Sequence, residues 1–591
     1  MFDKGAHDRD YIDSTVVIAR ASGGMVRDKT TGEMRMGGDQ KEHHTVSSFR
    51  NSMMYFNPVV IIAGDQNPRM PSKVPHAYCV LDYFKGTHIW SEKSGGYIMH
   101  RCRFEKFNAT KPSWWQAQGT EDSVTLGALA KPFKQSCKHC GTVSEQVYLQ
   151  GWMCLQPACE SFWKLPPLSS DAEGLEPDKK SLEYDPRFLK QKTRWPIDDS
   201  IYPLTSDSAS LSNQSVLGED CSLAYWRGIM CPYCGRCNSR LHWTAWKCEN
   251  KGCSFFKKVP HAIIPPTSLR DPYFPLSTQY TLSKDTHLLY VGLHVSFAHN
   301  YRINKYTIPG IDGFVVHMIA NQTVIEEPGG ADDMFVALQE TDIGLRRRAL
   351  KSGVLKGDNY TRHFLVNYGM PYKFIAATDS VSFEGAVRPV TDTRSRLNWP
   401  AKYILAQHQG KPVREIEADW KAKEFNEVLA LGYFEDQKIS YHDDGESGLG
   451  STIATLSLGA PGTMRLRMKA RHHSGISSKG LYNDNPPMPG CDKYDAPYQA
   501  HLKEVAKDLG FTAARNAPDA ISMMLGHGDV VIMHGAAIQK YYEHAVEHEG
   551  KLRFALTCRY IDPDSLPDKD KPTYKVRPNS GNYDGAAVGR G

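Results

Sequence analysis

The sequence has no apolar run near the about 18–20 residues that cross a bilayer, so it predicts no membrane helix. Its first residues, MFDKGAHDRDYIDS, lack the apolar core of a secretory signal. The chain also has little net charge. Its 71 basic residues nearly balance its 66 acidic ones and leave a formal net charge of +5. This small excess is compatible with a nucleic-acid partner but does not indicate one. We therefore expect an intracellular protein of the nucleus or cytoplasm, without a membrane partner.

At 591 residues the chain is too long for one hydrophobic core, and its length suggests three or four domains. Runs such as FNPVVIIAG (56–64) combine β-branched residues with turn formers and predict strands. We expect a mixed, β-dominated multidomain protein. Outside the motifs described below, the predicted parts are a flexible lead (1–45), a β-rich domain (46–120), a linker (166–220), a β/α connecting region (263–359) with a helix at 331–350, and a disordered tail (563–591).

The 14 cysteines include two clusters with the same spacing, C-x2-C-x13-C-x4-C. In each cluster a glycine follows the second cysteine, and a tryptophan stands two residues before the third. In a reducing compartment, clustered cysteines indicate metal binding, and two such knuckles supply the four thiolates of a closed, structural zinc site. Each cluster therefore resembles a zinc ribbon, the first at 130–165 and the second at 221–262. The predicted zinc ligands are Cys137, Cys140, Cys154 and Cys159, and Cys231, Cys234, Cys248 and Cys253.

Other interpretations of these modules stay open. The cysteines could be reduced thiols without metal, the two modules could exchange ligands, or Cys237 could replace one ligand. Arg240, Trp243, Trp246 and Lys257 either contact nucleic acid by stacking and charge or form the module's own core and solvated face.

A second group of motifs lies in the C-terminal third. The spacing of His442 and Asp444 places both side chains on one side of an extended segment, which favours Asp444 over Asp443. With a distant histidine they form a two-His-one-carboxylate face, which leaves positions open on Fe(II) for a chelating cosubstrate and oxygen. Arg553 and Arg559 stand six residues apart in a strand-like run, so both point to one face. An arginine buried in a barrel requires an anion, and its planar fork suits a carboxylate.

The order of these motifs resembles the AlkB-like branch of the Fe(II)- and 2-oxoglutarate-dependent dioxygenases. That order is H-x-D, a SLG turn (457–459), HGD (527–529), a histidine, and R-x5-R inside an LT-x-R strand. The resemblance covers about 360–562 and implies a double-stranded β-helix (jelly roll) with flanking helices. It also implies that His442, Asp444 and His544 bind iron, that Arg553 binds the distal carboxylate of 2-oxoglutarate, that Arg559 supports the cosubstrate or the site, and that Tyr433 hydrogen-bonds the cosubstrate.

Two positions depart from the family pattern. Relatives often carry Asn two residues before this tyrosine and two residues after the first arginine, where this chain has Leu431 and Ala555. Loss of these amides removes about 1 kcal/mol each of net hydrogen bonding, so we expect weaker or altered 2-oxoglutarate binding. The about 100 residues between Asp444 and His544 include a polar insert, 470–518, that either covers the site or is a surface excursion.

Several single residues have alternative interpretations. His548 would replace His544 as a ligand if its segment were helical. His527 and His534 are interpreted as polar residues at strand ends. Arg465 and Arg467 alternate with apolar residues, which favours a solvated strand face over a phosphate contact.

The resemblance implies hydroxylation of a C–H bond, with loss of the methyl group where that carbon is attached to nitrogen. AlkB-like enzymes often act on N-methylated bases in DNA or RNA, as in DNA repair, after the base is flipped from its stack. We therefore expect nucleic acid as a partner, besides 2-oxoglutarate and oxygen. Tyr368 and Tyr372, in the predicted lid at 367–390, either stack on the substrate or pack internally.

Two other functions stay open. The ribbons and the N-terminal domain, of which 88–115 resembles part of an SRA-type reader of modified cytosine, could form a nucleic-acid- or chromatin-binding adaptor with an inactive oxygenase domain. An active oxygenase could also act on protein or on a small molecule. The retained iron-ligand residues argue against the inactive version.

Overall fold

A computed structural model describes the chain in several stretches, which form two compact units. Unit 1 comprises 1–212, 229–238 and 248–255, and unit 2 comprises 213–228, 239–247 and 256–591. None of the helices in the described stretches is long and apolar enough to cross a membrane. The described residues are 7–21, 25–27, 34–40, 44–94, 96–117, 119, 126–166, 174–178, 181–196, 218–226, 228–259, 262–270, 283–350, 360–372, 380–446, 448–474, 476–477, 480–481 and 516–589.

Unit 1 is built on a five-stranded antiparallel sheet with the order β1-β2-β7-β6-β5. Its longest part is the β6–β7 hairpin, in which Ser94 pairs with Tyr97 next to the turn. Small strand pairs belong to the two cysteine modules. The elements are β1 (Tyr11–Ile12), β2 (Val16–Arg20), β3 (Met25–Arg27), β4 (Met34–Met36), α1 (His44–Met54), β5 (Val59–Gly64), β6 (Tyr78–Ser94), β7 (Tyr97–Lys106), β8 (Lys134–Ser136), β9 (Val143–Glu145), α2 (Pro186–Lys190), β10 (Ile229–Met230) and β11 (Cys237–Asn238).

Two predicted irregular regions of unit 1 contain ordered elements. The lead supplies β2, whose Val16, Val17 and Ile18 are fully buried because the strand pairs with β7 inside the sheet. The expected linker contains α2, which begins after the N-cap Asp185 and buries Phe188 in an aromatic cluster. Both expectations are wrong. The apolar runs in these two segments are short and lie among polar residues, so the sequence pattern predicted irregular structure there. Residues 197–217 of the expected linker lie outside the described part.

Unit 2 contains two antiparallel-dominated sheets. One has nine strands in the order β15-β16-β17-β27-β22-β29-β20-β18-β19, and the other has five in the order β14-β26-β23-β28-β21. Apolar residues of both sheets meet in one core cluster, which includes Ile453 and Val531 from the first sheet and Leu466 and Ile521 from the second. The two sheets therefore face each other, as a jelly roll requires.

Some strands of these sheets are buried on both faces, as β20 is. In others, such as β23, successive residues alternate between a buried and a more exposed face. The five-stranded sheet consists of β14 (Thr286–His287), β21 (Lys438–His442), β23 (Gly462–Met468), β26 (Asp519–Leu525) and β28 (Tyr542–His548). The nine-stranded sheet consists of β15 (Gly292–Ala298), β16 (Tyr301–Thr307), β17 (Phe314–Ala320), β18 (Phe364–Gly369), β19 (Ser380–Val381), β20 (Glu427–Phe434), β22 (Leu449–Gly459), β27 (Val530–His534) and β29 (Leu552–Ile561).

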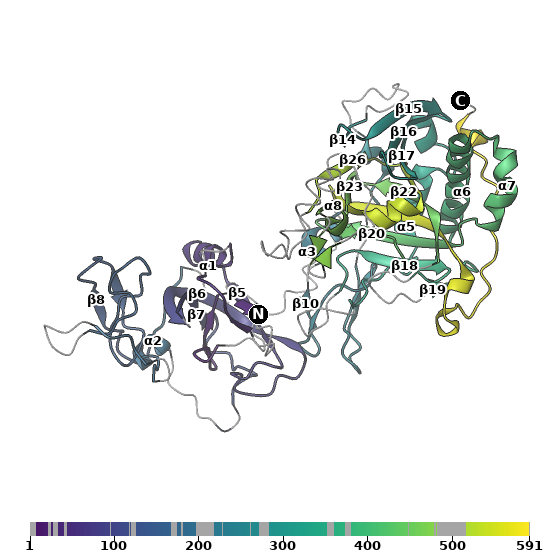
Figure 1. Ribbon diagram of the computed structural model, residues 1–591. Helices are drawn as coiled ribbons and strands as arrows, with labels where there is room; N and C mark the ends of the chain where they lie inside the picture. The colour runs from purple at the N-terminus through teal and green to yellow at the C-terminus, as the bar shows by residue number, and fades with distance from the viewer. Residues whose placement is uncertain are drawn as a thin grey trace, which may run out of the picture. The chain divides into compact units, whose positions relative to one another are not determined.

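Helices cover the outer face of the nine-stranded sheet, with α6 and α7 running side by side (Figure 1). Leu397 and Ile404 of α6 and Phe335 of α5 pack in one cluster with Leu456 and Leu556 of the sheet. The sheet is therefore buried on both faces. The remaining elements of unit 2 are α3 (Leu223–Trp226), β12 (Ala245–Lys247), β13 (Phe256–Lys258), α4 (Gln322–Ile325), α5 (Ala331–Glu340), α6 (Arg388–Gln409), α7 (Val413–Ala422), α8 (Ala470–Ser474), β24 (Ile476–Ser477), β25 (Gly480–Leu481) and α10 (Ala536–Tyr541).

Unit 2 differs from the sequence-based expectation in three places. The connecting region 263–359 is not a separate part, because its strands β15, β16 and β17 continue the nine-stranded sheet through the β17–β27 pairing. The helix expected at 331–350 ends at Glu340. The tail expected to be disordered packs on the unit, since Val588 is fully buried and Tyr583 lies against Trp399.

Candidate active site

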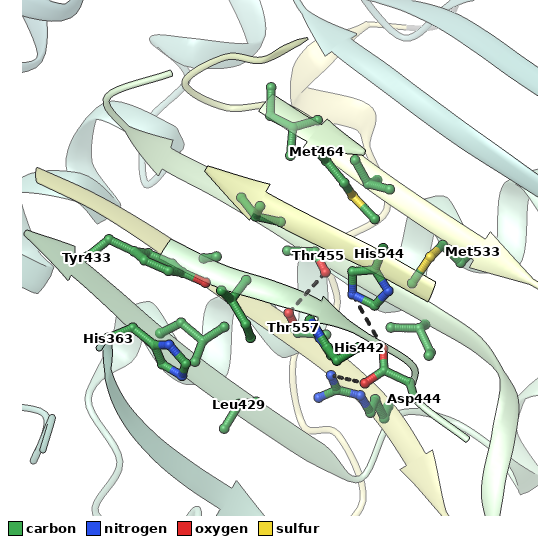
Figure 2. A pocket seen from close by; sticks show the side chains of 18 of the residues that line it. His363, Leu429, Tyr433, His442, Asp444, Thr455, Met464, Met533, His544 and Thr557 are labelled. Carbon is green, nitrogen blue, oxygen red and sulfur yellow. Dashed lines mark hydrogen bonds and ion pairs between the residues drawn. The ribbon is translucent and has the colours of Figure 1, made fainter. Parts of the chain in front are cut away.

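A pocket lies between the two sheets of unit 2 and collects the predicted oxygenase residues. His442, Asp444 and His544 lie together, and Tyr433 and His363 lie at the opposite side (Figure 2). Arg553 and Arg559 also line it, so both arginines point to one face of β29 as their spacing predicts. Most of the remaining wall is apolar: Leu429, Leu431, Ile439, Ile453, Met464, Leu525, Val531, Met533, Val546 and Ala555.

The three predicted iron ligands come from neighbouring parts of the five-stranded sheet. His442 ends β21 and is paired in register with His544 of β28, so that the ring centroids are 4.2 Å apart. Asp444 follows β21 directly, and its Oδ2 is 3.9 Å from Nε2 of His544. The Nδ1 atom of His442 lies 2.8 Å from the carbonyl oxygen of Ser440.

The chemistry of this donor set fits Fe(II). Asp444 Oδ2 is buried and has no hydrogen-bond partner among the described residues, although a buried carboxylate oxygen without a partner is costly. Two imidazoles beside that oxygen complete a two-His-one-carboxylate set. The prospective ligand atoms of His442, Asp444 and His544 lie farther from one another than the sulfur atoms within each cysteine group. In the described part of the chain, only the two four-cysteine groups have all their prospective ligand atoms within 4.8 Å of one another.

The other oxygen of Asp444 is held firmly. Its Oδ1 accepts a hydrogen bond of 2.5 Å from Tyr372 and one of 3.1 Å from Nη2 of Arg559. The hydroxyl of Tyr372 also lies 3.1 Å from Oε2 of Glu446, and Arg559 is paired with the buried Glu427 at 3.4 Å. Arg559 therefore holds the carboxylate of Asp444 directly. Because Oδ1 is engaged twice, Asp444 presents Oδ2 toward His544.

Burial and neighbouring charges set the protonation of these groups. Burial lowers the pKa of His544 to about 3, with further lowering by His442 and Arg559. Burial alone would raise the pKa of Asp444, but Arg559 and the two histidines hold it well below its usual range. At neutral pH the carboxylate is therefore charged and the imidazole neutral, which are the forms that bind a metal.

The opposite end of the pocket contains an arginine, Arg553, that forms no ion pair with any residue that the structure describes. Arg553 is 1% exposed, and its Nη2 donates to Ser457 at 2.9 Å. Its Nε and Nη1 atoms have no hydrogen-bond partner in the part of the chain that the structure describes, and burial lowers its pKa. A fully buried guanidinium in this state is costly unless a ligand supplies an anion.

The neighbours of Arg553 follow from the register of the sheet. Tyr433 is its direct cross-strand neighbour on β20, and the guanidinium carbon is 5.5 Å from the tyrosine ring centroid. Leu431 and Ala555 form the next pair along the same two strands and also line the pocket. The two positions that depart from the family pattern are therefore adjacent to the arginine, where neither side chain donates a hydrogen bond.

The structure also decides between the alternatives for single residues. Asp443 forms an ion pair with Lys469 and does not line the pocket, whereas Asp444 does and lies beside His544. His548 lies in a strand, β28, and is displaced along it from the position of His544. His527 pairs with Asp332 at 3.1 Å. His534 lies 2.8 Å from the hydroxyl of Thr452, and Arg465 and Arg467 pair with Glu547 and Glu543 on the outer face.

The tyrosines of the predicted lid both have internal roles. Tyr368 is 5% exposed, donates to the carbonyl of Ile343 and stacks on Phe383, so it packs internally. Tyr372 donates to Asp444 instead of presenting its ring for stacking. Residues 373–379 of the lid lie outside the described part, as do most residues of the insert 470–518.

The cysteine modules each bring together their own four thiols. In the first, Cys137 and Cys159 have their sulfur atoms 3.7 Å apart, as do Cys140 and Cys154. In the second, the corresponding distances are 3.6 Å, and Cys237 is not part of the group. A tetrahedral Zn²⁺ with Zn–S bonds of about 2.3 Å requires sulfur atoms about 3.8 Å apart. Both groups therefore fit zinc, without exchange of ligands between modules.

Two residues considered for nucleic-acid contact belong to the core of unit 2. Trp243 stacks on Phe434 with ring centroids 4.1 Å apart, and Arg240 is 1% exposed and donates to main-chain carbonyls, including that of Asp220. Trp246 is equally buried. These side chains are structural, which favours the second of the two interpretations of the sequence.

Sequence reasoning missed four residues at or next to the pocket. Tyr372 and His363 line it, and Glu427 and Ser457 are the partners of Arg559 and Arg553. Ser457 could have been found from its place in the SLG turn motif. The other contacts join segments far apart in the sequence and leave no local signal.

The pocket between the two facing sheets is thus lined by histidines, an aspartate and two arginines. Residues 384–560 match the family model of the 2OG-Fe(II) oxygenase superfamily, so this part of the chain is a 2OG-Fe(II) oxygenase domain. A search of the curated proteins finds no match. Among solved structures, the chain is similar to that of OsALKBH1, with 15% identity over 43% of this chain and 99% of that one. The TM-score of this match is 0.22, which is too low to support a conclusion about this chain.

Proposed function

We propose that unit 2 is an Fe(II)- and 2-oxoglutarate-dependent dioxygenase of the AlkB-like kind. In this proposal His442, Asp444 and His544 hold the iron, and Arg553 with Tyr433 holds 2-oxoglutarate. The observation that carries it is the buried guanidinium of Arg553, whose Nε and Nη1 have no hydrogen-bond partner among the described residues, in the same pocket as the three prospective ligands. Arg559, by contrast, is paired with the carboxylate of Asp444.

Bound Fe(II) with 2-oxoglutarate supplies oxygen activation and hydroxylation of a C–H bond. The chain's own residues prepare the site for that chemistry. Tyr372 and Arg559 orient Asp444 through one oxygen, and hydrogen-bond partners of a metal ligand tune both its geometry and the affinity for the metal. The apolar wall, which includes Met464 and Met533, keeps water away from the reacting groups.

The substrate class proposed is an N-methylated base of DNA or RNA, from which hydroxylation of the methyl carbon removes the methyl group. Support comes from the order of the motifs, H-x-D, HGD, His and R-x5-R, within the matched oxygenase domain. A base in a duplex must be flipped from its stack to reach a pocket of this depth. Repair of methylated DNA in the nucleus is one setting in which such an activity operates.

We also propose that each cysteine module holds one structural zinc ion. Four thiolates close the coordination sphere, so neither ion has a position for a substrate. The support is the spacing of the sulfur atoms, 3.6–3.7 Å within each group.

The test is succinate formation by the full chain with Fe(II) and 2-oxoglutarate, with and without methylated DNA and RNA oligonucleotides. His442→Ala removes one ligand, and Glu547→Gln on the outer face of β28 is the matched control. Succinate from the wild type and the control, but not from His442→Ala, supports the oxygenase. Loss of methyl groups from one oligonucleotide supports the substrate class. No succinate under any condition contradicts the enzyme, and succinate without any demethylation redirects the proposal to protein or a small molecule.

A further inference from the structure

The inner face of β28 carries a polar residue that the proposed iron and cosubstrate roles do not use. Side chains alternate along a strand, so His544, Val546 and His548 point to the same side. The first two line the pocket. Both ring nitrogens of His548 are buried and have no hydrogen-bond partner among the residues that the structure describes.

His548 lies beside the unpaired arginine. Its cross-strand neighbour on β23 is Gly462, where an added Cβ would come within 3.1 Å of Arg553 Nε. The ring of His548 is 5.9 Å from that of Tyr433, whose centroid is 5.5 Å from the guanidinium carbon of Arg553. Burial lowers the pKa of His548 to about 4, and the positive charge of Arg553 lowers it further. The three side chains therefore lie together at one corner, where Tyr433 and Arg553 line the pocket and His548 lies next to them.

This corner contains more donors than the protein satisfies. Arg553 Nε and Nη1 and the nitrogens of His548 all lack partners in the described residues. Each buried polar group without a partner costs free energy, so a cluster of them indicates a ligand that accepts several hydrogen bonds. A carboxylate does so, because its two oxygens offer about four lone-pair sites. Leu431 and Ala555, next to the arginine, contribute no donor.

We propose that His548 donates a hydrogen bond to the distal carboxylate of 2-oxoglutarate, beside Arg553, and so helps to select a dicarboxylic 2-oxoacid over a monocarboxylic one. This inference rests on the proposed function and names a positioning residue for its cosubstrate. His548 supplies a donor in the part of the pocket where Leu431 and Ala555 have none.

Two other roles for His548 fit the geometry less well. As a metal ligand it would have to lie beside Asp444, but it stands four residues beyond His544, about 13 Å along the strand. A packing role against Tyr433 would not require ring nitrogens. A phenylalanine preserves the packing and removes the donors, so the two explanations can be separated by substitution.

The experiment measures binding by calorimetry, with Mn(II) in place of Fe(II) to prevent turnover. 2-Oxoglutarate is compared with 2-oxopentanoate, which has the same chain length but no distal carboxylate. The variants are His548→Phe, His548→Gln, which keeps a donor, and Glu547→Gln as the control on the opposite face. We expect His548→Phe to weaken 2-oxoglutarate about tenfold, the effect of one hydrogen bond to a charged group. The affinity for 2-oxopentanoate stays unchanged, and His548→Gln recovers most of the loss.

Unchanged 2-oxoglutarate binding in His548→Phe, or equal weakening of both ligands, would overturn the inference while leaving the enzyme intact. Failure of the proposed function gives a different result. In that case the wild type does not bind 2-oxoglutarate, or binds it equally well after Arg553→Met. Melting temperatures of all variants without ligand identify any variant that fails to fold, and His548→Gln then provides the second measurement.

Discussion

Replacement of Arg553 by methionine should separate the stability of the protein from its function. Arg553 is 1% exposed and two of its three guanidinium nitrogens lack partners in the described part of the chain. Each such buried group costs about 1–3 kcal/mol, and replacement of a buried charge by an apolar side chain of similar volume is often neutral or stabilising by about 1–4 kcal/mol. Without ligand, Arg553→Met should therefore be as stable as the wild type or more stable.

Binding of 2-oxoglutarate should change in the opposite direction. Two hydrogen bonds from a guanidinium to a carboxylate contribute about 1.5–3 kcal/mol each, so their loss lowers affinity by about 100-fold or more. Calorimetry with Mn(II) measures the affinity, and melting curves with and without 2-oxoglutarate measure stability. Saturating ligand should raise the melting temperature of the wild type but not of the variant, because only the native wild type binds it.

Two results would refute this reasoning. Affinity within threefold of the wild type would show that Arg553 does not hold the cosubstrate. A melting temperature many degrees lower without ligand would show that the guanidinium is structural. The control is Arg465→Met on the outer face, where the side chain is paired with Glu547 and no change in affinity is expected.

Three further predictions concern the surroundings of the site and the metal modules. Tyr372→Phe removes the 2.5 Å hydrogen bond to Asp444 and should weaken Mn(II) binding about 10–100-fold, with little change in unfolding temperature. An unchanged metal affinity would contradict a positioning role for Tyr372. Burial alone would lower the pKa of His317, but hydrogen bonds and the charges of Asp285 and Asp529 raise it to about 9. The stabilisation of the fold by protonated His317 is fully present below about pH 6.5 and is lost as the pH rises through about 9. His317→Gln should lower the free energy of unfolding by about 3–5 kcal/mol at pH 6, measured by hydrogen exchange in β17. This loss of stability should become smaller toward pH 10. A loss that stays constant with pH would refute the charge pairing. Cys140→Ser should lower the zinc content of the full chain from two ions to one, measured by elemental analysis, while 2-oxoglutarate affinity stays the same.

Local spacing in the sequence was sufficient for the parts of the site that lie within one strand or one knuckle. His442 and Asp444 lie on one side of an extended segment, and Arg553 and Arg559 share a face of β29, because alternation is a property of the backbone. The two four-cysteine groups follow from the same kind of short-range geometry.

Tertiary structure alone decided how these segments meet. The strand β2 in the lead, the strands β15–β17 and the buried Val588 of the tail depend on pairing and packing with residues far away in the chain, which local composition does not encode. The same holds within the pocket. Among the described residues Arg559 has a carboxylate partner and Arg553 has none, although both are arginines on one strand, because the loop after β21 brings Asp444 to only one of them. The sequence therefore determined which side chains share a face, and the contact between the sheets determined which of them remains available for a ligand.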